Sequence, residues 1–262
     1  MNRIMHTAAS GMAAQQLNID TISNNLANVN TPGFKKSRVE FQDLLYQSIK
    51  PAGAETLGDA ENPTELQVGC GVRPMGTAKM FSQGEVIQTG NPLDVAIQGD
   101  GFFQVLLPDG TMHYTRDGAF KISPDGQIVN SEGYALEPEI SIPVDTSSNT
   151  ISLDGQVSVY VSGVEEPQEV GQIELVRFIN PGGLKNMGHN LYAKTTASGE
   201  PAFGTPGNEG YGTLEQMYLE TSNVDIVAEM VNMIVAQRAY EINSKSIRTA
   251  DDMMQMVNQL KR

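Results

Sequence analysis

The chain has 262 residues, of which 18% are charged and 39% hydrophobic, which argues against a wholly disordered protein and against a membrane protein. Its net charge of −14 arises between the two ends, because both terminal segments are close to neutral. An acidic middle excludes nucleic acid as a natural partner, since phosphate binding needs clustered lysine and arginine.

The first predicted element is a helix over residues 1–30. Its apolar residues recur at the alternating three- and four-residue spacing of a coiled-coil seam. The seam consists of Met5, Met12, Ile19 and Leu26 at one position and Ala8, Gln15, Ile22 and Val29 at the other. Pro32 and Gly33 predict that this helix ends at Asn30–Thr31.

Residues 31–76 are predicted to form an extended stretch without regular structure. Prolines and glycines interrupt its second half, at Pro51, Gly53, Gly58, Pro63, Gly69, Gly71, Pro74 and Gly76. Proline disfavours regular helix and glycine permits close approach to a neighbouring chain. The stretch is therefore either a slack linker or an arm that reaches another subunit.

The middle of the chain, residues 77–212, is predicted to be an antiparallel β domain. Asp-Gly pairs recur at residues 100–101, 109–110, 117–118, 125–126 and 154–155, between short apolar or alternating runs. Asp-Gly in such a setting is a strong signal for a β-hairpin. Meanders are expected from about residue 90 to residue 195.

The last element, residues 213–262, contains neither glycine nor proline and is predicted to be a second long helix. Ser222 and Asp225 have the spacing of a capping box, in which Ser222 would be the N-cap. A second seam follows at Ile226, Met230, Met233, Tyr240, Ile247, Ala250, Met254 and Val257, with Gln237 and Asn243 interrupting it. The whole pattern indicates an α+β fold with two long terminal helices that pair as a coiled-coil-like element.

These helices are expected to be marginal on their own. Burying about six large side chains of the first seam contributes roughly 10–15 kcal/mol, whereas ordering its backbone costs about 1–2 kcal/mol for each residue. The ends of the chain therefore favour assembly with further copies.

Amide-rich clusters lie in both helices. The asparagines near the end of the first helix either mark a fraying end or hydrogen-bond a neighbouring helix and set its register. The predicted subunit interface comprises Met12, Ile19, Ile22, Asn24, Asn25, Leu26, Asn28, Val29, Met230, Met233, Gln237, Arg238, Tyr240, Asn243, Ile247 and Met254.

No pattern for catalysis, a cofactor or a metal emerges from the sequence. It lacks the G-x-S-x-G, H-E-x-x-H, C-x-x-C and P-loop patterns. Cys70 is the only cysteine, which excludes an intrachain disulfide. The start of the chain lacks the apolar core of a secretory signal, so we expect a protein that is cytoplasmic or exported by a route that needs no such signal.

Three motifs in order along the chain resemble the bacterial flagellar basal-body rod protein family. They are NNLANVNTPGFK at residues 24–35, GFFQV with YTRDG at residues 101–105 and 114–118, and VAQRAYEINSK at residues 235–245. Within that family, FQDLLYQ at residues 41–47 and GVRP at residues 71–74 resemble the members that build the distal rod.

The resemblance implies a non-enzymatic structural subunit of the rod that crosses the periplasm. Implied partners are copies of itself, other rod proteins, the hook protein, the ring bushing around the rod and the flagellar type III export apparatus. The terminal helices would line the inner tube and the β domain would lie outside it. The alternatives are another axial flagellar protein, an adhesin, or a periplasmic cell-wall hydrolase with a carboxylate pair.

Overall fold

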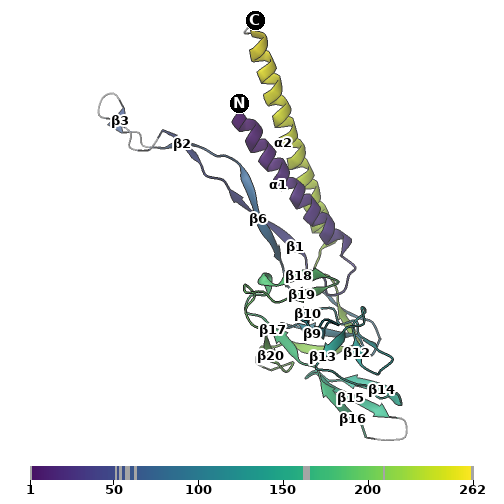
Figure 1. Ribbon diagram of the computed structural model, residues 1–262. Coiled ribbons are helices and arrows are strands. Elements are labelled where there is room, and N and C mark those ends of the chain that lie inside the picture. The colour runs from purple at the N-terminus through teal and green to yellow at the C-terminus, as the bar shows by residue number, and fades with distance from the viewer. Residues whose placement is uncertain are drawn as a thin grey trace. The chain divides into compact units, whose positions relative to one another are not determined.

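The computed structural model describes residues 2–50, 52, 55–56, 60–61, 64–161, 166–208 and 210–260. The chain forms two compact units and passes between them several times. Unit 1 comprises residues 1–26, 37–78 and 225–262, and unit 2 comprises residues 27–36 and 79–224. Figure 1 shows the two long helices and the β-rich part of the chain.

Unit 1 contains two helices and a narrow β ribbon. Helix α1 spans Asn2–Ala27 and helix α2 spans Ile226–Leu260. The ribbon consists of two-stranded pairs: β1 (Ser37–Asp43) with β6 (Val72–Lys79), β2 (Gln47–Lys50) with β5 (Leu66–Val68), and β3 (Glu55–Thr56) with β4 (Ala60–Glu61). The second and third pairs are antiparallel. Neither described helix is long and apolar enough to cross a membrane.

Unit 2 is built around a seven-stranded sheet in the order β11-β12-β13-β9-β10-β19-β18. Its strands are β9 (Phe103–Leu106), β10 (Met112–Thr115), β11 (Lys121–Ile122), β12 (Ile128–Val129), β13 (Ala135–Glu137), β18 (Lys185–Gly188) and β19 (Leu191–Ala193). A three-stranded sheet contains β14 (Thr146–Ile151), β15 (Gln156–Val161) and β16 (Gln168–Gln172). The described pairings within both sheets are antiparallel.

Three short pairs and a 3-10 turn complete unit 2. They are β7 (Val86–Gln88) with β22 (Tyr218–Glu220), β8 (Val95–Gln98) with β21 (Thr213–Gln216), β17 (Leu175–Arg177) with β20 (Ala202–Gly204), and the turn Pro181–Gly183. The late strands β21 and β22 thus pair with strands more than a hundred residues earlier in the chain.

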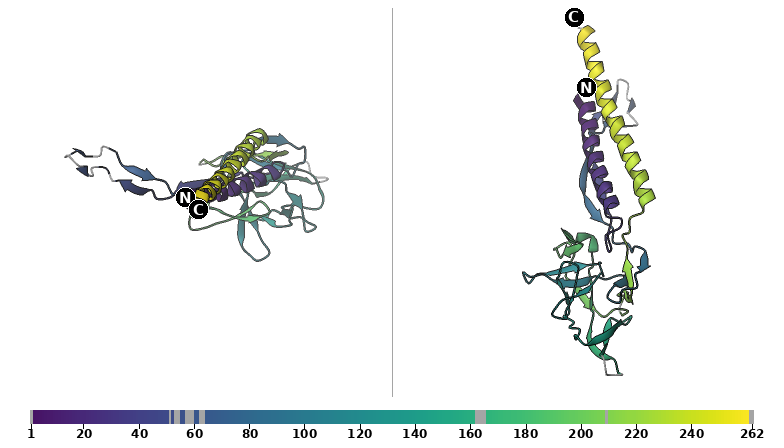
Figure 2. Two further views of the ribbon diagram at one scale, coloured as in Figure 1. Left: turned by 90° about the horizontal axis from the view of Figure 1, so that it is seen from above. Right: turned by 90° about the vertical axis from the view of Figure 1, so that its right-hand side faces the viewer.

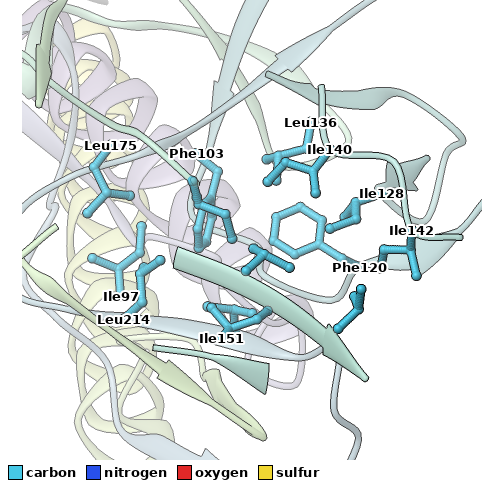
Figure 3. Packing of buried hydrophobic residues seen from close by; sticks show 14 residues of the cluster. Ile97, Phe103, Phe120, Ile128, Leu136, Ile140, Ile142, Ile151, Leu175 and Leu214 are labelled. Carbon is cyan, nitrogen blue, oxygen red and sulfur yellow. The ribbon is translucent and has the colours of Figure 1, made fainter. Parts of the chain in front are cut away.

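The main core of unit 2 fills with aliphatic side chains around two phenylalanines (Figure 3). The rings of Phe103 and Phe120 meet edge to face with centroids 5.0 Å apart. A second cluster consists of Phe102, Tyr114, Val176, Phe178, Leu184 and Tyr192. Edge-to-face rings add directional stabilisation beyond simple burial, so these clusters give unit 2 its own core.

The structure confirms the α+β class, with terminal helices around an antiparallel β region. Two details of the C-terminal prediction are wrong. The second helix begins at Ile226 and not at residue 213, because Thr213–Gln216 and Tyr218–Glu220 are strands. Its N-cap is Asp225, whose Oδ1 accepts hydrogen bonds from the N–H groups of Val227 and Ala228.

The stretch expected to lack regular structure contains the ribbon. Its first two pairs run through Ser37–Asp43 and Val72–Lys79, and through Gln47–Lys50 and Leu66–Val68. Glycine and proline concealed this pairing, because they are poor strand formers when read one residue at a time. Pro51, Gly53, Gly58 and Pro63 lie outside the described residues.

Candidate functional site

Helices α1 and α2 run antiparallel, and the C-terminal part of α2 extends beyond the start of α1 (Figures 1 and 2). Two contacts between the helices define their register. Asn25 lies against Glu229, and Gly11 lies against Asn243. Both contacts lie fourteen residues apart on each helix, which is two heptads of a coiled coil. They therefore belong to one continuous pairing register.

The side chain of Asn25 links three elements of unit 1. Its Nδ2 donates to the carbonyl of Ser37 at 2.8 Å and to Glu229 Oε2 at 3.4 Å, and its Oδ1 accepts from the N–H of Ser37 at 2.9 Å. Asn25 and Glu229 are both buried. A buried, fully bonded amide specifies one arrangement of its neighbours, so Asn25 fixes α1, the start of β1 and α2 together.

The contact at Gly11 depends on the absence of a side chain. A Cβ at Gly11 would lie 2.9 Å from Nδ2 of Asn243. A side chain at this position would therefore require the amide of Asn243 to shift. Asn243 belongs to the predicted seam, whereas no sequence pattern indicates a role for Gly11.

The predicted seam residues of α1 occupy mixed environments. Ile22 is buried and 5% exposed, whereas Asn24 is exposed. Met12, Ile19 and Leu26 are half-buried. Asn28 and Val29 are also half-buried but follow the last residue of α1, so they belong to a turn and not to the helix.

The predicted seam residues of α2 divide in the same way. Met233, Asn243, Ile247 and Met254 are half-buried. Met230, Gln237, Arg238 and Tyr240 are exposed. In the first half of the helix, Glu229 and Ala236 are the buried residues instead of Met230 and Gln237. The buried stripe thus runs one residue earlier there than the sequence suggested.

A second face of α2 is apolar and uncovered in the single chain. Val227 is 72% exposed and Ile234 is 56% exposed. The uncovered apolar residues of the first half of the helix are Ile226, Val227, Met230, Val231, Ile234, Val235 and Ile242. Contiguous exposed apolar residues of this kind mark interaction surfaces.

The ribbon exposes apolar side chains as well. Leu45 is 90% exposed, and Phe41, Tyr46, Ile49, Leu66 and Met75 are also exposed. A hollow of about 600 Å³ near the end of β1 and the start of β6 is lined by Gln42, Asp43, Leu44, Leu45, Tyr46, Cys70 and Arg73. Isolated two-stranded ribbons are marginally stable in water, so this ribbon gains from a covering neighbour.

A buried charged cluster in unit 2 was not anticipated from the sequence. It comprises Lys35, Arg116 and Glu220, whose side chains are 0%, 3% and 1% exposed. Lys35 Nζ donates to Glu220 Oε1 at 2.5 Å, and Arg116 Nη1 lies 3.3 Å from Glu220 Oε2. Burial lowers the pKa of Lys35, and the adjacent Glu220 carboxylate opposes that effect. The only signal available was the position of Lys35 and Arg116 in two of the sequence motifs.

Among the residues that the structure describes, no three His, Cys, Asp or Glu side chains gather as a possible metal site. Cys70 is a free thiol.

Three segments of the chain match families of flagellar proteins. Residues 5–35 match the family described as flagella basal body rod protein. Residues 96–159 match the D1 domain of the flagellar hook protein FlgE/F/G, and residues 215–260 match the C-terminal part of the flagellar basal body rod FlgEFG protein.

Similar proteins extend over the full length of the chain. The flagellar basal-body rod protein FlgG of Borreliella burgdorferi is 53% identical over 264 residues, covering 100% of both chains. The protein of the same name from Caulobacter vibrioides is 51% identical and covers 98% of both chains. That of Bacillus subtilis is 41% identical and covers 100% of both chains.

Proposed function

Because the chain belongs to the flagellar basal-body rod protein family, we propose that it is a structural subunit of the distal rod, the shaft that carries motor torque to the hook. It polymerises with copies of itself and meets other rod proteins, the hook protein and the surrounding ring. It reaches the rod through the flagellar type III export apparatus. It acts as a structural element and not as an enzyme.

The uncovered apolar face of α2 is the observation that carries this proposal. Full burial of one large aliphatic side chain contributes about 1.5–3 kcal/mol, and seven such residues lie on this face. A single chain leaves them in water. Neighbouring copies packed around a common axis would cover them, and the antiparallel pairing of α1 with α2 presents the face in a fixed orientation.

The predicted interface residues fit this proposal in part. Met230, Gln237, Arg238 and Tyr240 are exposed and available to a neighbouring copy. The side chain of Asn25 already donates hydrogen bonds to Ser37 and Glu229 of its own chain. We propose that the exposed members contact neighbouring subunits, whereas Ile22 and Asn25 hold the helix pair that presents them.

The direct test is to remove the gene and image the basal bodies by electron cryomicroscopy. We expect rods that stop short and carry no hook, because every later component needs the missing subunits as a base. The full-length chain supplied from a plasmid should restore complete rods. Complete rods and hooks in the deletion strain would contradict the proposal, and cell walls left intact by the purified chain would exclude the alternative of a hydrolase.

The ribbon is the proposed source of stiffness. A tube of parallel subunits bends only if neighbours slide along its axis, and an arm that touches an adjacent subunit opposes sliding. Exposed Leu45, Ile49 and Leu66 supply apolar contacts along such an arm. The paired helices alone do not account for a rigid shaft, because the pliant hook is implied to contain similar helices.

Deleting residues 48–68 is expected to give polymers that still form but bend. The helix pair and unit 2 remain complete in this variant, so assembly through α2 should persist. Curvature measured on negatively stained polymers should rise clearly above that of the unaltered chain. A matched control replaces residues 48–68 with a Gly/Ser segment of equal length, which should bend in the same way. Straight, stiff polymers from both variants would assign stiffness to the helices or to unit 2.

A further inference from the structure

Three segments far apart in the chain meet at one place in unit 2. They are residues 33–36, 80–84 and 220–223. The N–H of Gly33 donates to the carbonyl of Glu220 at 2.8 Å, and the N–H of Met80 donates to the carbonyl of Lys36 at 2.9 Å. Main-chain hydrogen bonds therefore join residues 33–36 to each of the other two segments.

Asn223 strengthens this meeting point with its side chain. Its Oδ1 accepts from the N–H of Lys36 at 2.8 Å, and its Nδ2 donates to the carbonyls of Met80 at 2.8 Å and Ser82 at 3.1 Å. One amide thus bonds both of the other segments. We call this arrangement, centred on residues 33–36, 80–84 and 220–223, the junction.

Glu220 is the anionic centre of the junction. Its carboxylate accepts from Lys35, from Arg116 and from the N–H of Gly84, the last at 2.8 Å. Lys35 Nζ also donates to the carbonyl of Ser82 at 2.9 Å. Charge-assisted bonds of this kind are about twice as strong as neutral ones, so Glu220 ties all three segments through one side chain.

The charges of the cluster do not balance. Two buried cations share one buried anion, and Arg116 Nε has no hydrogen-bond partner among the residues that the structure describes. Removing one partner of a buried ion pair leaves an uncompensated charge in a poorly solvated place. Loss of Glu220 would leave two facing cations, whereas loss of Lys35 would leave the neutral pair of Arg116 and Glu220.

The junction lies where the chain leaves unit 2. The chain passes between the units after residues 26, 36, 78 and 224, and three of these four points adjoin junction segments. The strand pair nearest to the last of them is short, because β7 and β22 match only three residues each. A strand pair this short would by itself resist little pulling force on the chain.

We propose that Glu220, held by Lys35 and Arg116, is a positioning residue that keeps the three exits of the chain from unit 2 together under load. The proposal rests on the proposed role in a torque-carrying rod. The three residues come from three separately matched segments of the sequence, residues 5–35, 96–159 and 215–260. The cluster therefore unites parts of the chain that three separate family models describe.

The first experiment uses hydrogen exchange on the purified full-length chain and its Glu220→Gln variant. The amides of Gly33, Gly84 and Asn223 should exchange at least about tenfold faster in the variant, because local opening of the junction becomes easier. Amides of the β14–β15 ladder should not change. The control is Lys194→Met, which breaks the exposed Lys194–Glu200 pair of the same unit and should leave junction exchange unchanged.

Lys35→Met is the second variant, and it keeps the test decisive if Glu220→Gln fails to fold. It leaves the bond from Gly84 to Glu220 in place, so exchange at Gly84 should stay slow while exchange at Lys36 and Asn223 rises. Equal exchange at all of these amides in the variant and the unaltered chain would overturn the clamping role.

The second experiment places each variant in cells as the only copy and increases the viscosity of the medium. Cells with Lys35→Met should build rods in normal number but stop rotating at a viscosity that the Lys194→Met control still tolerates. Equal load tolerance together with faster exchange would reduce the cluster to a purely structural role and overturn the proposal. Rods that form without this chain would defeat the proposed function, whereas the exchange result would stand.

Discussion

Gly33→Ala is expected to destabilise unit 2 by about 3–5 kcal/mol, a large fraction of the total stability of an ordinary domain. Gly33 has a φ of +68°, where a residue with a Cβ costs roughly 1–2 kcal/mol. The added Cβ would also lie 2.6 Å from the main-chain N of Asp117 and 2.7 Å from the carbonyl carbon of Arg116. Main chain cannot rotate away as a flexible side chain can, so the segment carrying Lys35 must move.

The matched control is Gly110→Ala. Gly110 has a similar φ of +79° but no atom within 4 Å of the position of the new Cβ. Its cost should be about 1 kcal/mol, which is the conformational term alone. Chemical denaturation followed by near-ultraviolet circular dichroism of the buried Tyr114 and Tyr192 measures both variants, and the chain contains no tryptophan to interfere. An equal loss of unfolding free energy in both variants would show that the main chain of Arg116 and Asp117 leaves room for a Cβ at residue 33.

Ile22→Asp is expected to abolish polymerisation while leaving unit 2 folded. Ile22 is 5% exposed in α1 and lies on the face that carries Asn25 one turn later. A buried, unpaired carboxylate costs several kcal/mol, which is more than a marginal helix pair can absorb. Without a fixed helix pair, the apolar face of α2 would no longer be presented to neighbouring copies.

The measurement combines sedimentation of polymers with thermal unfolding of the soluble chain. Ile22→Asp should give no sedimenting polymer, and the tyrosine signal of unit 2 should melt within about 2 °C of the unaltered chain. Ile22→Leu is the conservative control, because a volume-conserving apolar swap costs less than about 1.5 kcal/mol. Polymers of normal length from Ile22→Asp would show that the helix pair is not needed for assembly.

The local patterns of the sequence determined the class of each element. Residues at three- and four-residue spacing predicted both long helices, and Asp-Gly pairs between short apolar runs predicted the antiparallel β region. These signals are local, since they depend on neighbours within one or two turns of the chain. The absence of glycine and proline after residue 212 predicted the start of the second helix less well, because β21 and β22 also lie in this part of the chain. Their strand conformation depends on pairing with β8 and β7.

Only the tertiary structure decided which face of each helix is buried against the rest of the chain. A heptad pattern does not show whether Met230 or Glu229 is buried when the partner helix and its register are unknown. The polar Glu229 is the buried one, because the side chain of Asn25 donates a hydrogen bond to it. The ribbon could not be predicted from local patterns either. Each of its pairs joins a strand from the first half of residues 37–79 to a strand from the second half. The buried cluster of Lys35, Arg116 and Glu220 could not be predicted from the sequence for the same reason. No local feature near Lys35 indicates that it pairs with a carboxylate 185 residues later in the chain. Charges are buried in pairs by contacts between distant segments, and such contacts exist only once the chain has folded.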